Sequence, residues 1–279
     1  MNITNVISET AIITLKSRVI EFQKEAPIIN DPVSLTCLEN IANHVPKETY
    51  QRIVDRKLPS TLTTHVAIRA RKYDLYTKEF LEKYPDALVV SLGCGFDTRY
   101  WRVSDSKWNY IEIDLADVIA AKKEILKDKI DYLTIGCSVL DEKWIREVLA
   151  IQDKHVLFLA EGLFMYLPQK EVESLFNKLS DSFTHSCIVF ETVNKKYTSG
   201  IWKKMVESKM KRSLGTDAGS SYQFGVNKAK EIESFGQNIK LVEEWSYFED
   251  EDIEPKILWY LRNMKFFTRT QWTIKAEIG

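Results

Sequence analysis

The sequence predicts an α/β fold, in which helices cover both faces of a parallel β-sheet and a helical region precedes the sheet. Three observations support this prediction. Residues 1–87 have helical spacing of apolar residues, short β-rich runs alternate with helix-like stretches from residue 88 onward, and a glycine turn ends the first run. Alternation of this kind is typical of a parallel sheet with helices on both faces. The chain of 279 residues, 44% of them hydrophobic, is long enough for one such unit.

The N-terminal region, residues 1–87, is predicted to be a helical cap. In ETAIITLKSRVIEFQKE, apolar residues recur at spacings of three and four, as on one face of a helix. Asp31-Pro32 marks a turn into a second helix, and Pro46 and Pro59 suit helix starts. Residues 59–83 show the clearest stripe, formed by Leu62, Val66, Tyr73, Tyr76 and Phe80.

The remainder, residues 88–279, is predicted to be the sheet domain, forming a single structural unit with the cap. Its expected strands are ALVVSL, YIEID, DYLTIG, HVLFLAE and SCIVFET, with helices near 116–128, 141–150 and 168–182. Two later runs, NIKLVEEWSYF and MKFFTRTQWTI, are expected to add antiparallel strands at the edge. The polar, Lys-rich stretch at about 195–235 is expected to be an inserted helical lid.

Composition excludes several classes of protein. The 39 basic and 40 acidic residues give a net charge of -1, which argues against nucleic acid as a partner. Four cysteines without a C-x-x-C pair indicate reduced thiols, and no cluster has metal-ligand spacing. We see no signal peptide and no apolar run near the ~20 residues of a membrane span. We therefore expect a cytoplasmic protein with no membrane partner and no metal.

A ligand site is predicted at the glycine turn LGCGFDTRYWR. Gly93 and Gly95 follow a predicted strand, and ligands of open α/β sheets bind at such strand ends. Glycine lets the backbone come close to a ligand. The pattern G-x-G-x-x-T lacks the third glycine of a dinucleotide site, and a simple strand-to-helix turn is the alternative interpretation. Asp97 and Arg99 are expected to shape this turn and connect it to the cap.

Two carboxylates end later strands. Asp114 lies 19 residues beyond Gly95, where an acid can accept hydrogen bonds from ribose hydroxyls. The alternative is that Asp114 caps the next helix. Glu112 is expected on the same face, but Asp114 is favoured because it ends the strand. Glu161 ends a very apolar strand, where a carboxylate is costly unless it is paired or faces a cleft.

The motifs LGCGFDTRYWR, YIEIDLADVIAAKK and AEGLFMYLP, in this order, resemble the leucine carboxyl methyltransferase family. That family includes protein phosphatase carboxyl methyltransferases and bacterial polyketide O-methyltransferases of the tetracenomycin type. The opening ETAIITLKSRVIEF and IRARKYD are similar to the bacterial branch, and the resemblance covers roughly residues 10–190. It implies a class I methyltransferase fold, a Rossmann-like sheet with a helical cap, that binds S-adenosylmethionine and releases S-adenosylhomocysteine.

The resemblance also implies cofactor-binding residues. Gly93 and the turn to Gly95 and Asp97 would lie against the cofactor, Asp114 would hold the ribose, and Glu161 would sit by the sulfonium end. Ser138-Val139 stands where the family commonly has Asp-Leu at the adenine, and serine can still hydrogen-bond the adenine amino group.

Arg69 is implied to bind the methionine carboxylate of the cofactor. It also falls on the apolar stripe of residues 59–83, where arginine is rare unless paired. A carboxylate ligand would pair with it in bidentate fashion. The alternative is an internal salt bridge to Asp74 or Asp97. Arg71 points to the opposite face and is expected to be solvated, while Arg18 matches a basic position of the family less specifically.

Methyl transfer from a sulfonium depends mainly on alignment of the acceptor oxygen. A carboxylate acceptor is ionised at neutral pH, whereas a phenol or alcohol usually needs a general base. His155 and His185 precede strands, at the wrong end of the sheet, and His65, one turn before Arg69, is expected to be packed or partly exposed. This scarcity of bases favours a carboxylate acceptor. Tyr166 is the candidate that orients its oxygen; packing against the lid is the alternative.

The sequence thus predicts an S-adenosylmethionine-dependent O-methyltransferase that acts on a small, polyketide-like acceptor. There are two main alternatives: a protein C-terminal carboxyl methyltransferase and a catalytically inactive cofactor-binding module. A nicotinamide dehydrogenase is a less favoured alternative. The oligomeric state is left open.

Overall fold

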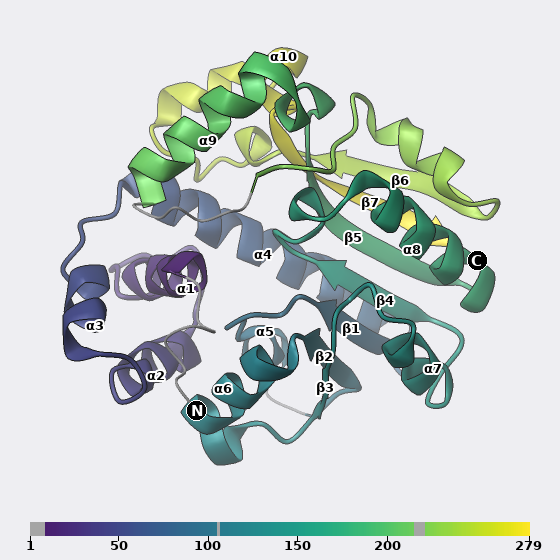
Figure 1. Ribbon diagram of the computed structural model, residues 1–279, viewed down its shortest axis with the longest axis horizontal. Coiled ribbons are helices and arrows are strands. Elements are labelled where there is room, and N and C mark those ends of the chain that lie inside the picture. The colour runs from purple at the N-terminus through teal and green to yellow at the C-terminus, as the bar shows by residue number, and fades with distance from the viewer. Residues whose placement is uncertain (1–8, 105–106, 215–220) are drawn as a thin grey trace.

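A seven-stranded β-sheet forms the centre of the computed structural model, which describes residues 9–104, 107–214 and 221–279 (Figure 1). The strand order is β3-β2-β1-β4-β5-β7-β6. Strands β1 to β5 form the parallel part of the sheet. Strand β7 pairs antiparallel with both β5 and β6. The bounds are β1 Leu88–Leu92, β2 Tyr110–Asp114, β3 Leu133–Gly136, β4 Val156–Ala160, β5 Ser186–Val193, β6 Ile239–Trp245 and β7 Gln271–Ile278. The predicted α/β class is confirmed.

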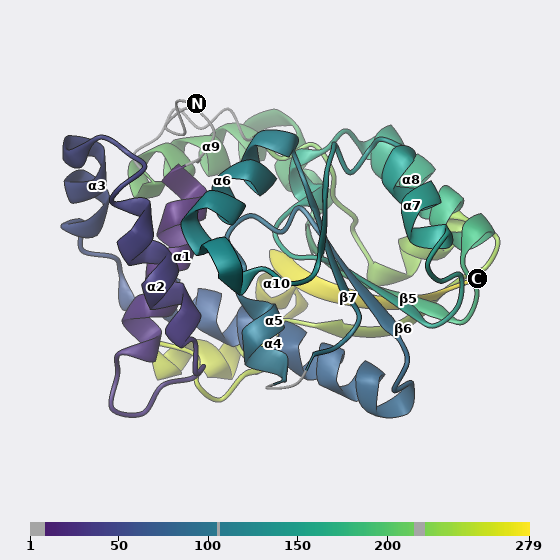
Figure 2. The ribbon, with the colours of Figure 1, turned by 90° about the horizontal axis from the view of Figure 1, so that it is seen from below.

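The N-terminal helices are α1 Glu9–Phe22, α2 Pro32–Ile41, α3 Lys47–Val54 and α4 Ser60–Lys83. Asp31 is the N-cap of α2. Its side chain accepts the backbone N–H of Ser34, and Pro32 occupies the first turn. Figure 2 shows α1, α2 and α3 gathered on one side of the sheet, next to α6 (Ala116–Leu126). Leu15 and Val19 of α1 share a buried apolar cluster with Ile125 of α6.

Different helices cover the two faces of the sheet. On one face, the stripe of α4 that includes Tyr73 and Phe80 packs on Val89 and Leu157. On the other, Trp144 of α7 (Lys143–Leu149) and Phe176 of α8 (Gln169–Ser182) belong to the largest core cluster. Short α5 (Arg99–Val103) follows the glycine turn. Buried side chains on both faces hold the strand ends in place, and these ends position the site.

The C-terminal third departs from strict alternation. The antiparallel edge strands are confirmed, although β7 lies between β5 and β6. The run MKFFTRTQWTI is a strand only in its second half, because residues 265–268 form α10 (Lys265–Thr268). The segment expected to be a lid contains η4 (Lys195–Thr198), α9 (Gly200–Leu214) and η5 (Ala229–Phe235), and η6 (Tyr247–Glu249) and η7 (Lys256–Leu261) follow β6. Within the described ranges, no helix is both long and apolar enough to cross a membrane.

Candidate active site

The glycine turn takes a conformation that requires glycine. Gly93 and Gly95, directly after β1, have φ of +63° and +48°, the left-handed region that side chains disfavour. A Cβ at Gly93 would come within 2.8 Å of a methyl carbon of Leu163, whereas a Cβ at Gly95 would meet nothing within 4 Å. Gly93 is therefore packed from behind, and Gly95 borders open space at the strand end.

Asp114 holds this turn from the end of β2. Its Oδ2 accepts the backbone N–H of Gly95 at 2.8 Å, and its Oδ1 accepts that of Leu115 at 2.8 Å. Burial raises the pKa of Asp114, and the two backbone hydrogen bonds partly oppose this shift. The N-cap residue of α6 is Leu115, which makes no side-chain capping hydrogen bond, and Asp114 lies one residue before it. The helix-cap interpretation of Asp114 is therefore wrong.

Arg99 is the centre of a buried cluster of charges. Its guanidinium donates to Asp74 Oδ1 at 2.9 Å, to Asp97 Oδ2 at 2.6 Å and to Glu161 Oε2 at 2.6 Å. The side chain of Arg99 is 1% exposed. Since Asp74 lies on α4, Arg99 and Asp97 do connect the turn to the N-terminal helices. Burial disfavours ionised Asp97, but Arg99 and Arg102 outweigh it and hold the pKa of that carboxyl well below its usual range.

A second layer of arginines surrounds this centre. Arg102 donates to Asp74 Oδ2 at 2.7 Å and to Asp31 Oδ2 at 3.1 Å. Arg18 of α1 donates to the same Asp31 oxygen at 3.1 Å and to the carbonyl of Phe96 at 2.6 Å. Asp31 therefore does more than mark a turn, because it joins two arginines from distant parts of the chain.

Beneath the turn, Lys122 and Glu112 form a buried ion pair with N–O distance 2.7 Å. Lys122 also donates to the carbonyl of Asp97 at 2.6 Å. Glu112 is fully buried, so it supports the turn from below, while Asp114 faces its edge.

Arg69 lies at the ends of β4 and β5. Its Nε donates to Glu161 Oε1 at 2.8 Å, and its Nη1 donates to Glu191 Oε2 at 2.9 Å. The alternative of an internal salt bridge is therefore observed, but with Glu161 and Glu191 as partners, because Asp74 and Asp97 bind Arg99 instead. Burial favours neutral Arg69, but Glu191 and Glu161 outweigh it and raise its pKa. Both carboxylates, in turn, have lowered pKa values because Arg69 overcomes the effect of burial.

Glu191 was not predicted as a site residue, although the sequence contains a signal for it. It interrupts the apolar strand SCIVFET in the way that Glu161 ends its own strand. The expectation that Arg71 is solvated is wrong, because its guanidinium is paired with carboxylates. It donates to Asp250 and Asp252, both at 2.7 Å, and so attaches α4 to the segment after β6.

Aromatic side chains flank the Arg69 end of the cluster. Tyr166, in η3 (Phe164–Tyr166), has its ring 5.6 Å from that of Tyr222, and burial raises the pKa of Tyr166 to about 12. The ring of His65 lies 4.2 Å from that of Tyr247, and its Nε2 is 3.9 Å from Glu191 Oε1. His65 is therefore packed and partly exposed, as expected.

The remaining candidates lie at the edges of this region. Ser138, after β3, is exposed, and its Oγ accepts the backbone N–H of Leu140 at 3.2 Å. The Val139 side chain is buried, and its carbonyl accepts the indole N–H of Trp144 at 2.9 Å. His155 and His185 lie at the opposite end of the sheet, as expected.

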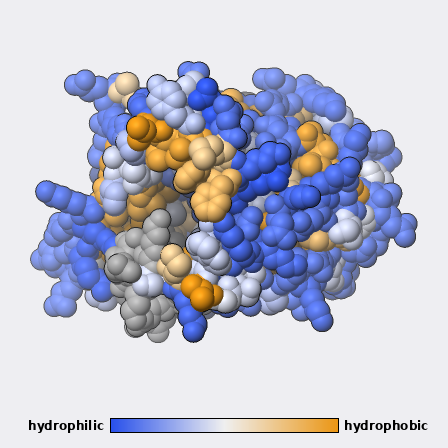
Figure 3. Space-filling view, turned by 90° about the horizontal axis from the view of Figure 1, so that it is seen from above, coloured by the Kyte–Doolittle hydropathy of each residue, from blue (hydrophilic) through white to orange (hydrophobic). Residues whose placement is uncertain are grey.

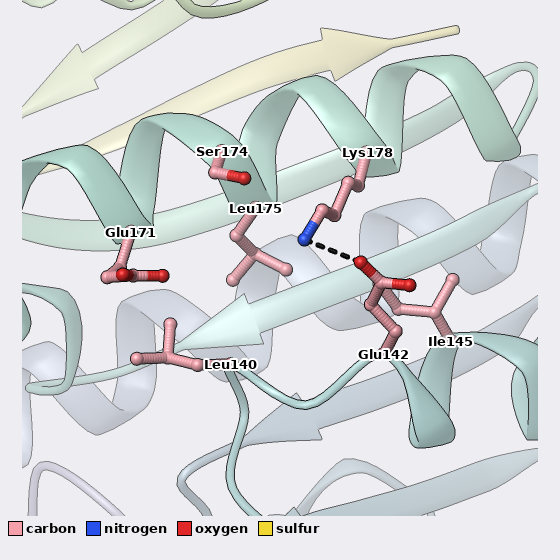
Figure 4. A pocket seen from close by; sticks show the side chains of 7 residues that line it. All are labelled: Leu140, Glu142, Ile145, Glu171, Ser174, Leu175 and Lys178. Carbon is pink, nitrogen blue, oxygen red and sulfur yellow. Dashed lines mark ion pairs between the residues drawn. The ribbon is translucent and has the colours of Figure 1, made fainter.

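A shallow crevice between α7 and α8 is separate from these residues (Figure 4). Lys178 and Glu142 form an ion pair across it at 2.8 Å, and none of the predicted site residues lines it. Among the described residues, no group of three or more His, Cys, Asp or Glu could hold a metal ion.

A Rossmann-like sheet with a glycine turn, an acid at the end of β2 and a charged cluster at the strand ends defines a class I S-adenosylmethionine-dependent methyltransferase. A solved structure from Thermobifida fusca YX, assigned to the methyltransferases, has this fold, with a TM-score of 0.56 at 14% identity over 87% of this chain and 93% of that one. Residues 11–180 match the family model of leucine carboxyl methyltransferase, and the chain belongs to this family.

Two proteins of known class are similar to this chain in sequence over much of its length. Tetracenomycin polyketide synthesis O-methyltransferase TcmP of Streptomyces glaucescens is 26% identical over 93% of this chain and 91% of its own length. The S-adenosyl-L-methionine-dependent methyltransferase dpfgK of Gibberella zeae is 31% identical over 64% of this chain and 62% of its own length. The predicted family, enzyme class and cofactor are thereby confirmed.

Proposed function

We propose that this enzyme transfers a methyl group to a carboxylate oxygen of a small, polyketide-like molecule. The proposal rests on the side chains near Arg69, which offer hydrogen-bond donors but no dedicated general base among the described residues. Tyr166 and Tyr247 are neutral hydrogen-bond donors at pH 7, as an ordinary phenol is, and burial raises their pKa values further, to about 12. His65, the described histidine nearest the cluster, lies against Glu191. Donors without a dedicated base suit an acceptor that is already ionised.

The cofactor fits the strand ends by the chemistry of the residues there. Open space beside Gly95 lets a ligand approach the backbone, and Asp114 offers acceptors for ribose hydroxyls. Arg69 would bind the methionine carboxylate, which would then share the guanidinium with Glu161 and Glu191. Glu161 would lie near the sulfonium, held in place by Arg99.

We propose that the adenine would lie at Ser138-Val139, on the far side of Asp114 from Arg69. The buried Val139 side chain offers an apolar surface, and exposed Ser138 keeps a free hydroxyl proton to donate. Asp97 would act on the cofactor through the turn, because its own oxygens bind Arg99 and Arg102.

The described parts of residues 195–235, which leave out 215–220, are proposed to form a lid over the acceptor, and those of residues 1–87, which leave out 1–8, a cap on the sheet domain. Gln223 supports this role for the lid, because its backbone N–H donates to the carbonyl of Met165 at 2.8 Å and its side chain to that of Tyr166 at 2.9 Å. Tyr222 thereby comes beside Tyr166 and could close one wall of the acceptor site.

The bound cofactor supplies an activated methyl group on a sulfonium. One bond forms between the acceptor oxygen and the methyl carbon while the carbon–sulfur bond breaks, which leaves S-adenosylhomocysteine and a methyl ester. The protein holds the acceptor in line and excludes water, so positioning carries much of the catalysis. The Tyr166 hydroxyl would donate to the acceptor carboxylate and fix its orientation.

An acceptor comparison tests this proposal. Matched polycyclic aromatic acids and phenols would be compared by transfer of a labelled methyl group from S-adenosylmethionine. We expect turnover on the acid, with kcat/KM nearly constant between about pH 6 and 9, since a carboxyl group is ionised throughout. Turnover on the phenol alone, rising with pH, would contradict the proposal. A peptide with a C-terminal leucine, methylated in preference to either, would instead establish the protein carboxyl methyltransferase.

Tyr166→Phe sharpens the test. We expect kcat/KM for the acid to fall about tenfold, the scale of one hydrogen bond to a charged group, with unchanged cofactor affinity. Tyr84→Phe is the matched control, because Tyr84 stacks on His155 at the opposite end of the sheet.

A further inference from the structure

The exposed apolar side chains of this enzyme are concentrated on one surface. Twelve large hydrophobic residues of the described chain are strongly exposed, and seven of them lie in residues 195–206 and 256–266. We call these two segments the basic–apolar surface. Figure 3 shows hydrophobic side chains gathered on the face that carries α9 and α10. The seven are Ile201, Trp202, Met205, Ile257, Tyr260, Met264 and Phe266.

The same two segments are strongly basic. They hold seven lysines and arginines and no aspartate or glutamate. Since the chain has 39 basic and 40 acidic residues, the remainder has 32 basic against 40 acidic ones. The molecule therefore separates charge, with positive charge on this surface and an acidic excess elsewhere. The seven are Lys195, Lys196, Lys203, Lys204, Lys256, Arg262 and Lys265.

The two segments form one continuous surface. The Lys196 ammonium lies 5.3 Å from the ring centre of Trp202 and 4.4 Å from that of Phe266, so it joins α9 to α10 (Figure 1). None of the seven basic side chains pairs with a carboxylate within the described ranges, whereas neighbouring Arg269 binds Glu244 at 2.6 Å. Lys256 and Arg262 donate to the backbone carbonyls of Glu251 and Trp259. The charges most available to an external anion are therefore those of Lys195, Lys203, Lys204 and Lys265.

We propose that the basic–apolar surface docks on an anionic lipid bilayer. Side chains with 76% exposure at Ile201, 72% at Tyr260 and 61% at Phe266 extend far enough to enter the interface between headgroups and acyl chains. Unpaired lysines around them would bind anionic headgroups. A patch of this composition is typical of an interaction site, and charge separation of this kind favours an anionic partner.

This proposal departs from the expectation of no membrane partner, which rested on the lack of long apolar runs. Surface attachment needs no such run, because only the tips of an amphipathic surface are buried. The first segment of this surface, residues 195–206, follows β5, the strand that carries Glu191. This segment belongs to the proposed lid, so docking would turn the lid toward the bilayer. The inference is independent of which acceptor is methylated.

Vesicle co-sedimentation of the full chain tests the proposal. The probes are vesicles of phosphatidylcholine alone and vesicles containing about one-third phosphatidylglycerol. We expect binding to the anionic vesicles only, weakening as salt rises from about 0.05 to 0.5 M, because salt screens exposed charges. Absence of binding to anionic vesicles at low salt would overturn the proposal.

Paired variants assign the binding to this surface. Trp202→Ser with Phe266→Ser should lower the partition coefficient at least about tenfold, because the apolar tips no longer enter the interface. Leu133→Ser with Ile151→Ser removes two exposed apolar residues elsewhere and should leave it unchanged. Equal loss in both pairs, or in neither, would contradict the assignment.

A charge pair completes the design. Lys203→Glu with Lys204→Glu should weaken binding at least about tenfold, whereas Lys154→Glu with Lys170→Glu makes the same charge change away from the surface. Affinity for S-adenosylhomocysteine verifies the fold of each variant. Two outcomes would overturn the bilayer as the occupant. One is a concentration-dependent dimer lost with Trp202→Ser; the other is a raised KM for apolar acceptors without vesicle binding.

Discussion

The arginine cluster at the strand ends and the basic–apolar surface over α9 and α10 carry positive charge in opposite ways. In the cluster, the side chains of Arg69, Arg99 and Arg102 are only 14%, 1% and 3% exposed, and each contacts at least two carboxylates. On the surface, four of the six lysines are exposed, Lys196 and Lys203 are partly exposed, and none has a carboxylate partner among the described residues. A buried charge requires partners and so has a fixed geometry, whereas an exposed charge keeps its hydration and attracts partners from outside.

This contrast separates two functions. The fixed geometry of the cluster is suited to a small cofactor whose charged ends must be placed within a fraction of an ångström. The unpaired surface is suited to a large and fluid partner that imposes no precise geometry. Substitutions in the cluster should therefore affect folding and cofactor binding, while substitutions on the surface should affect neither.

The largest expected effect is that of Arg99→Met. The change leaves Asp74, Asp97 and Glu161 buried without their shared partner, and removal of one member of a buried ion pair costs about 3–5 kcal/mol. Urea unfolding should show this loss. Arg146→Met is the control, because the Arg146 side chain is 72% exposed and should change stability by less than about 0.5 kcal/mol. Similar effects of the two substitutions would show that the cluster is not the structural centre proposed here.

Asp114→Asn should affect the cofactor more than the fold. The neutral side chain keeps one oxygen for the N–H of Gly95, but it binds a ribose hydroxyl less strongly than a carboxylate does. Hydrogen bonds to charged groups contribute about 1.5–3 kcal/mol, so affinity for S-adenosylhomocysteine should fall at least about tenfold. Calorimetric titration measures this change, and exposed Asp117→Asn serves as the control. A tenfold loss with Asp117→Asn as well would remove the special role of Asp114.

The cluster should also make stability depend on pH. The folded pKa values of Asp97, Glu161 and Glu191 are lowered, mainly by arginines. The unfolded chain therefore binds protons first as pH falls, and stability, complete above about pH 5, decreases toward the lowered folded pKa values. Glu112 acts in the opposite direction, because burial raises its folded pKa.

Glu191→Gln tests the sign of this dependence. The free energy of unfolding should fall less between pH 6 and pH 4 in this variant than in the wild type. Glu25→Gln, which changes an exposed carboxylate without an ion pair in the described ranges, should keep the wild-type slope. A steeper slope in Glu191→Gln would contradict the account.

The smallest effect is expected on the basic–apolar surface. Lys203→Glu with Lys204→Glu removes no ion pair within the described ranges, so the free energy of unfolding should change by less than about 0.5 kcal/mol. Thermal and urea unfolding measure it. A loss comparable to that of Arg99→Met would mean that these lysines are structural.

The contrast between the two regions also shows what a sequence can predict. The position of Gly93, Asp114 and Glu161 at one edge of the sheet was predictable, because each breaks an apolar strand pattern at its end and a strand end can be recognised from local sequence. Arg69 was found for the same kind of reason, as a charge on an apolar stripe.

The partners of these residues were not predictable in the same way. Asp74 and Glu191 contact Arg99 and Arg69 only after folding brings separate segments together, at 2.9 Å in both cases. The pairing of Arg71 with Asp250 joins residues 179 positions apart, and no local pattern indicates it. Likewise, the basic–apolar surface unites two segments that are distant in sequence.

The measurement that tests the central claim most directly is calorimetric titration of the wild type and of Arg69→Ala with S-adenosylmethionine, S-adenosylhomocysteine and NAD. We expect that the wild type binds both sulfur cofactors and not NAD, and that Arg69→Ala loses most of this affinity while remaining folded. A folded Arg69→Ala with wild-type affinity, or a folded wild type that binds NAD instead, would contradict the placement of the cofactor at the cluster.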